Sequence, residues 1–145
     1  MNKLKRLLRA AFCANGQFSA KLHYKCGIIL SEVTAVKTDK EKLIAVIYND
    51  ASRDDEIDDA VMDLSKFDDD DVIQILMEVA NDASFDNMIR ASAGESLADI
   101  WIRKSIVDYK QLASLTEIAL KEALALIKSK RADWYTTFSE LYRLK

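Results

Sequence analysis

The sequence lacks proline entirely and contains only three glycines among its 145 residues. These two residues are the usual markers of turns and strand ends, so their scarcity argues against a fold of many short strands. Half of the residues are apolar and under a third are charged, which excludes disordered and fibrous chains. We therefore expect a single all-helical domain over residues 1–145 with one core.

Cysteine and histidine are also scarce. Cys13 and Cys26 are the only thiols and His23 is the only histidine, so the spacing of a zinc site is missing. A nucleophile paired with a histidine base and a glycine-rich phosphate loop are missing as well. We expect no metal, no cofactor and no enzymatic activity.

Long hydrophobic runs are absent. No segment approaches the roughly 20 apolar residues needed to span a bilayer. The basic start of the chain, residues 1–12, is not followed by the apolar stretch of a signal peptide. The expected location is the cytoplasm, where both cysteines would stay reduced.

Apolar residues recur at helical spacing along most of the chain. Thr38 and Glu41 form a capping box, which indicates a helix start. A second box, Ser114 to Glu117, is expected to open a helix over 118–127. Trp101, Trp134 and Tyr135 are expected to pack in the core or between helices. Helices are expected within residues 2–34, 39–48, 118–127 and 132–144, in addition to those of the repeat described next.

The chain repeats itself at a shift of 32 residues. Asn49–Ile57 aligns with Asn81–Ile89, and six of nine positions are identical. An apolar helix precedes each copy and an amphipathic helix follows it, so each unit is a helix, a polar turn and a helix. One hairpin cannot bury its apolar face alone, and a repeat of this period therefore predicts hairpins stacked into an α-solenoid.

The second copy, residues 81–100, resembles the HEAT repeat. The likeness lies in the turn aspartate, the pair Ile89-Arg90, the small residues Ala91, Ala93 and Gly94, and Leu97. The resemblance implies an all-α fold, a short right-handed α-solenoid of HEAT-like helical hairpins with about eight helices. The hairpins would span about 39–67 and 69–103, with flanking helices in 2–34 and 105–144. Ile89, Ala93, Leu97 and Ile100 would form the buried stripe.

The first copy departs from the family pattern at the arginine. Asp58 stands where the second copy has Arg90. The turn-bracing role that the resemblance gives to this arginine is therefore not expected in the first hairpin.

Charge is unevenly distributed. The net charge is only −3, yet residues 50–86 carry fourteen acidic and two basic residues, while residues 1–48 carry nine basic and three acidic ones. The amphipathic helix after the first turn must bury its apolar side chains, which leaves Asp55, Asp59 and Asp63 outside, with Asp58 beside them. The expected partner-binding residues are Asp55, Asp58, Asp59, Asp63, Asp69, Asp70, Glu95 and Asp99.

Other interpretations of the charged residues stay open. They could simply form a solvated face. Asp54–Asp58 also matches the Asp-Asp-x-x-Asp pattern that holds magnesium diphosphate in prenyl-transferring enzymes, although those chains are far longer. Metal binding at Asp68–Asp71 is a minor alternative, because this run lacks the alternation and the glycine of a calcium loop. The basic residues of segment 1–12 could touch phosphate or a membrane surface, but four charges are few.

Taken with the HEAT resemblance, an acidic face predicts a protein partner with a basic surface and argues against nucleic acid as a direct ligand. Small acidic HEAT-like proteins of this kind resemble immunity proteins of contact-dependent growth-inhibition systems. That resemblance implies a protein that forms a one-to-one complex with a nuclease-type toxin and covers its active site. The alternative is a scaffold or accessory subunit of a larger helical assembly.

Overall fold

The computed structural model describes residues 38–142. Helices cover 77% of these residues, and no strand occurs among them. The expectation of an all-α fold is thereby confirmed, whereas the helices expected within residues 2–34 lie outside the described range. The helices are α2 (Asp39–Tyr48), α3 (Asp54–Leu64), α4 (Asp70–Asn81), α5 (Asn87–Lys104), α6 (Tyr109–Ala113), α7 (Glu117–Lys130) and α8 (Ala132–Tyr142).

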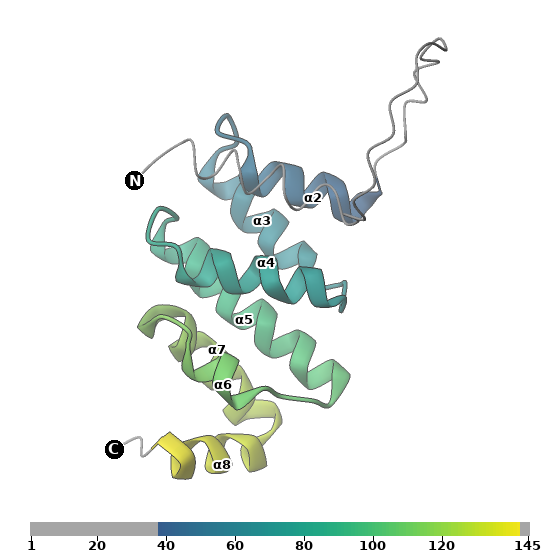
Figure 1. Ribbon diagram of the computed structural model, residues 1–145. Helices are drawn as coiled ribbons and strands as arrows, with labels where there is room; N and C mark the ends of the chain where they lie inside the picture. The colour runs from purple at the N-terminus through teal and green to yellow at the C-terminus, as the bar shows by residue number, and fades with distance from the viewer. Residues whose placement is uncertain (1–37, 143–145) are drawn as a thin grey trace, which may run out of the picture.

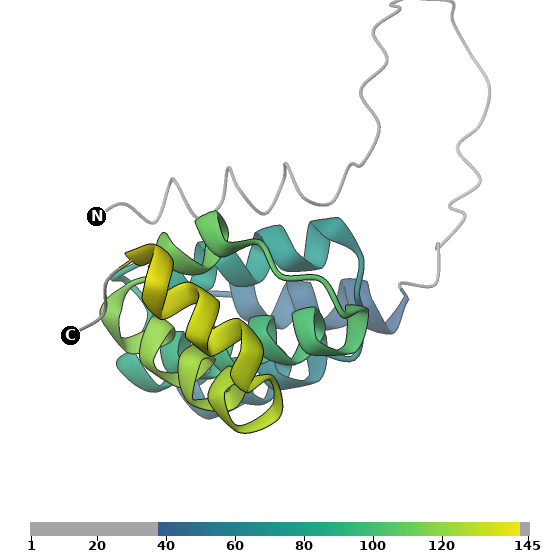
Figure 2. The same cartoon turned by 90° about the horizontal axis from the view of Figure 1, so that it is seen from below.

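The helices pair into hairpins that stack in one direction, from α2 and α3 at one end to α7 and α8 at the other (Figure 1). Helix α5 packs on α4 within its hairpin, on α3 of the preceding hairpin and on α7 of the following one. Helices α3, α5 and α7 thus form one layer, and α2, α4 and α6 lie on its other side. Seen end-on, α8 lies across α7 (Figure 2). The arrangement is all-helical and repeat-like.

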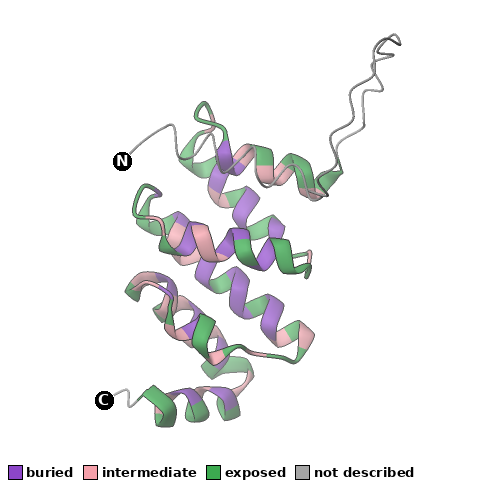
Figure 3. Ribbon diagram, viewed as in Figure 1, coloured by how far each residue is buried: buried purple, intermediate pink, exposed green. Residues whose placement is uncertain are grey.

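The core lies between the two layers, where the buried sides of the helices face one another (Figure 3). The expected stripe on α5 is confirmed, since Ile89, Ala93, Leu97 and Ile100 are all fully buried. Burying one large aliphatic side chain contributes about 2 kcal/mol. Because α5 buries this stripe and packs on α3, α4 and α7, it is the central helix of the described fold.

Small residues allow α5 and α7 to approach closely. A Cβ atom placed on Gly94 would overlap the carbonyl oxygen and the Cα atom of Ala119 on α7. Ala119 and Ala123 are fully buried against this side of α5. Glycine is therefore required at position 94 by space and not by backbone conformation.

The two expected capping boxes have different outcomes. At Thr38 the box is confirmed, because the Thr38 hydroxyl accepts from the Glu41 amide and the Glu41 carboxylate accepts from the Thr38 amide. The box expected at Ser114 is wrong. Ser114 ends α6, and Thr116 is the residue before α7. The helix α6, capped by Asp108, occupies the residues before Ser114. The helix expected over 118–127 is nevertheless confirmed as α7, which begins at Glu117.

The final helix lies where the sequence places it, although only residues up to 142 are described. Trp101 and Trp134 are buried and Tyr135 packs half-buried against the core, so their expected packing roles are confirmed. Phe138 is buried as well. Leu141 is 60% exposed and Tyr142 is exposed too, because within residues 38–142 no helix follows α8 to cover its outer end.

Candidate protein-binding face

Two contacts place α3 and α5 side by side. The Ser96 hydroxyl donates to the carbonyl oxygen of Val61 at 3.3 Å, and the Arg103 guanidinium donates to the carbonyl oxygen of Ser65 at 2.6 Å. From the first contact to the second, the residue numbers rise along both helices, so α3 and α5 run parallel. Their solvent-facing residues therefore form one continuous surface.

We call this surface the acidic face. It consists of Asp55, Asp58, Asp59 and Asp63 on α3 together with Glu95 and Asp99 on α5. On α3 the buried residues Ile57, Val61 and Leu64 take the opposite side of the helix, which turns the carboxylates outward. All six residues are exposed except Asp58, which is half-buried.

Three of these carboxylates are already paired within the chain. Arg53 lies 3.1 Å from Asp55, Lys66 lies 2.7 Å from Asp63, and Arg103 lies 2.9 Å from Asp99. The sequence pattern treated all acidic residues alike and missed this pairing. The spacings i, i+3 and i+4 of the last two pairs could have indicated it.

The other three carboxylates form no ion pair with any residue in the described part of the chain. They are Asp58, Asp59 and Glu95. No cation of the described residues therefore cancels their negative charge. These three residues are the part of the acidic face that attracts a cation from outside most strongly.

The two hairpins differ in the contacts made at the position where Asp58 departs from the repeat pattern. In the second hairpin, Arg90 donates from Nε to the carbonyl oxygen of Ala80 at 3.5 Å and from Nη1 to the Asn87 side chain at 3.4 Å. Arg90 thus joins the end of α4 to the start of α5. At the equivalent position, Asp58 buries its Oδ1 atom without a hydrogen-bond partner. A buried acceptor left unpaired costs about 1–3 kcal/mol.

Two methionines on the same surface were missed by sequence reasoning. Met62 on α3 is 45% exposed and Met88 on α5 is 52% exposed. Met62 follows Asp58 by one helical turn, and Met88 precedes Glu95 by two. Methionine is flexible and polarisable, and it is common on surfaces that adapt to protein partners. Both methionines lie outside the apolar periodicity of their helices, and this could have indicated from the sequence that they are exposed.

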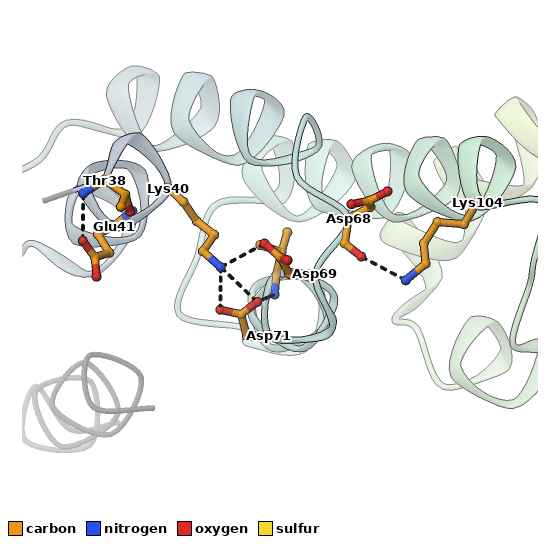
Figure 4. A network of polar contacts seen from close by, with 8 residues as sticks. Thr38, Lys40, Glu41, Asp68, Asp69, Asp71 and Lys104 are labelled. Carbon is orange, nitrogen blue, oxygen red and sulfur yellow. Dashed lines mark hydrogen bonds and ion pairs between the residues drawn. The ribbon is translucent and has the colours of Figure 1, made fainter. Parts of the chain in front are cut away.

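Asp69 and Asp70 lie elsewhere, at the start of α4 in the other layer. Lys40 of α2 lies 2.9 Å from Asp69 and 3.1 Å from Asp71 (Figure 4). Lys104 donates to the carbonyl oxygen of Asp68 at 2.9 Å and lies 3.6 Å from Asp70. The hydrogen bond that the Lys40 ammonium donates to the Asp69 carboxylate is the main cause that raises the pKa of Lys40. This turn therefore links hairpins, and the structure does not bring it together with the acidic face.

Within residues 38–142, no group of three or more His, Cys, Asp or Glu side chains is arranged to hold a metal ion. None of the helices in that range combines the length and the apolar character needed to cross a membrane. Cys13, Cys26 and His23 lie outside the described residues.

Comparison with protein-family models, with curated proteins and with solved structures found no match for this chain.

Proposed function

We propose that this chain is a protein-binding module whose acidic face covers a basic surface on a protein partner. The observation that carries the proposal is that Asp58, Asp59 and Glu95, on two adjacent parallel helices, form no ion pair within residues 38–142. Met62 and Met88 on the same two helices are exposed. Carboxylates supply long-range attraction and register, and methionines supply adaptable apolar contact.

The energetics favour a binding role over a solvated face. Solubility requires no buried oxygen, yet Asp58 keeps one without a partner. Residues that lower the stability of a fold are concentrated at functional sites, because function can select for them. A partner lysine or arginine could satisfy the Asp58 carboxylate and recover part of its cost.

The specific partner that we propose is a basic toxin domain of the nuclease type, which this chain would neutralise as an immunity protein in a one-to-one complex. The acidic face would occupy the lysines and arginines that the toxin uses for phosphate, and so block its active site. This part of the proposal rests on the HEAT resemblance together with the charge pattern. It assigns the chain no catalytic activity of its own, no direct nucleic-acid ligand and a cytoplasmic location.

Capture from a lysate of the source organism, followed by mass spectrometry, tests the proposal. The expected product is a basic nuclease domain whose activity on DNA or RNA is abolished by one molar equivalent of the full chain. A captured protein without nuclease activity, or a complex as stable in 1 M salt as in 0.1 M, would contradict it, since a Debye length of about 3 Å at 1 M screens the acidic face.

Two charge-matched variants sharpen this test. The double variant Asp59→Asn/Glu95→Gln removes unpaired carboxylates, and Asp55→Asn/Asp63→Asn removes paired ones. Both change the net charge equally, so general steering is altered alike. We expect the first variant to weaken binding by roughly tenfold more than the second, because only its carboxylates lack an ion-pair partner among residues 38–142. Equal losses would show that net charge alone matters.

A scaffold or accessory subunit is the second candidate, and a specific observation favours it. Leu141 and Tyr142 leave apolar surface exposed at the last helix of the stack, where a further helical subunit could continue it. A scaffold should self-associate or bind through this end. Sedimentation velocity of the full chain, with Leu141→Glu as the comparison, separates the two: an immunity protein stays monomeric with either residue.

A further inference from the structure

The opposite layer carries a groove that the acidic face does not use. Two hollows, of about 710 and 610 Å³, lie along the outer side of α4 and share Gln74 and Met77. Together they extend from Asp70 at the start of α4 to Ser84 in the turn after it. Helices α4 and α6 both lie on the side of the stack that faces the viewer in Figure 1. We call this surface the α4 groove.

The α4 groove is apolar toward α6. Ile73, Met77 and Trp101 line it there, and Ile106 lies at its edge with 67% of its surface exposed. Ile106 is held in place by the end of α5: Ser105 takes a left-handed conformation with φ of 56°, and the Ile106 amide donates to the Trp101 carbonyl oxygen at 3.1 Å. A large aliphatic side chain is thus kept at the mouth of an apolar hollow.

The rim of the groove is acidic. Asp70, Glu78, Asp82 and Asp108 line the two hollows, and Lys104 is the one basic residue among the described lining. An occupant of this groove should therefore combine an apolar side with several positive charges.

The chain itself contains such a segment. Residues 1–37 include seven Lys or Arg and a single acidic residue. Within residues 1–12 the apolar residues Leu4, Leu8 and Phe12 recur every four positions, and basic residues stand between them. This is the pattern of an amphipathic helix that lays its apolar side in a groove.

The point of attachment also suits the groove. The segment joins the described fold at Thr38, and Lys40, two residues later, is bound to Asp69 and Asp71 on either side of the groove residue Asp70. The roughly 25 residues between Phe12 and Thr38 could extend about 80 Å, so any part of the groove lies within reach.

We propose that residues 1–12 of this chain dock in the α4 groove of the same molecule. Their leucines and Phe12 contact Ile73, Met77, Trp101 and Ile106, and their lysines and arginines lie against the acidic rim. The proposal is independent of the function assigned to the acidic face, which lies on the other layer.

Disulfide trapping in the full chain tests the proposal. Cys26→Ser leaves Cys13, next to Phe12, as the only native thiol. Gln111→Cys then adds a thiol at an exposed position in the groove, and Lys121→Cys adds one at an exposed position on α7 as the matched control. Under mild oxidation we expect the intramolecular disulfide to form roughly tenfold faster with Gln111→Cys, because docking raises the local thiol concentration.

A charge reversal distinguishes recognition from mere proximity. Lys5→Glu, Arg6→Glu and Arg9→Glu together should reduce the Gln111→Cys rate to that of the control, without altering residues of the described fold. Equal rates for the two cysteine positions would overturn the proposal, and so would fast trapping that ignores the charge reversal. Disulfide-linked dimers in place of monomers would also overturn it, since a second copy would then occupy the groove.

Discussion

The first and second hairpins share a sequence pattern but differ in how completely the polar groups at their turns and helix caps are hydrogen-bonded. In α4 and α5 the turn is braced by Arg90, the cap residue Asp86 accepts from the Met88 amide, and the buried stripe is complete. In α2 and α3, Asp58 replaces the arginine and leaves a buried oxygen unpaired. Arg53 takes the cap position without a side-chain acceptor. The turn of the second hairpin is thus well paired, whereas the first hairpin carries a cost in stability at Asp58. We propose that this cost serves binding.

The largest expected effect concerns the side of the second hairpin that packs on α7. Gly94→Ala should destabilise the fold by about 3 kcal/mol, because its Cβ atom would overlap backbone atoms of Ala119, which cannot turn aside. Urea unfolding followed by circular dichroism measures this. Ser92→Ala, on the same helix but half-buried, serves as the control and should change stability by less than about 0.5 kcal/mol. A Gly94→Ala variant as stable as the control would show that α5 and α7 can separate at no cost.

Removing the brace should have a smaller effect. Arg90→Ala is expected to cost about 1 kcal/mol, since two long hydrogen bonds to Ala80 and Asn87 are lost. Hydrogen exchange of the amides in residues 82–90 should accelerate with it. Unchanged stability and exchange would mean that Arg90 does not brace the turn, and the contrast between the hairpins would lose its main support.

The matching change in the first hairpin should act in the opposite direction. Asp58→Ala removes the unpaired buried oxygen and introduces the best helix former, so stability should rise by about 1 kcal/mol. Asp59→Ala, one position along and exposed, is the control for helix propensity and should gain less. A loss of stability at position 58 would indicate that the Asp58 carboxylate is already satisfied in the folded chain.

The smallest expected effect is at the cap of α3. Arg53→Ser would complete a capping box, because the Glu56 carboxylate already accepts from the backbone amide of residue 53. The gain should be about 0.5 kcal/mol, reduced by the loss of the exposed ion pair to Asp55. Thermal unfolding at low and high salt separates the gain from the cap from the loss of the ion pair, because salt screens only the ion pair. A variant less stable than the unaltered chain at high salt would count against the capping argument.

Much of the fold follows from the sequence, because periodic apolar residues decide which side of a helix is buried. Ile89, Ala93, Leu97 and Ile100 on α5 illustrate this. The short helix α6 and the cap residue of α7 did not follow, since the local signal at Ser114 was overruled by packing. Leu115 is buried, and the Thr116 hydroxyl donates to the carbonyl oxygen of Ala80 at 2.7 Å. A local sequence pattern cannot predict a contact between residues 36 positions apart.

The acidic face followed from the sequence only in part. Helical spacing correctly placed Asp55, Asp59 and Asp63 on the outside of α3. It could not show which carboxylates are neutralised, because that depends on whether a neighbouring lysine or arginine side chain reaches them. It also grouped Asp69 with this surface, although Lys40 engages Asp69 at the start of α4.

The proposal that the first hairpin exchanges stability for binding is tested most directly by the affinity of Asp58→Ala for the captured basic partner, measured by isothermal titration calorimetry against the unaltered chain. We expect binding roughly tenfold weaker, corresponding to about 1.4 kcal/mol, in a variant that unfolds at higher urea concentration. Binding of equal or greater strength would contradict the proposal, since Asp58 would then lower stability without serving the partner.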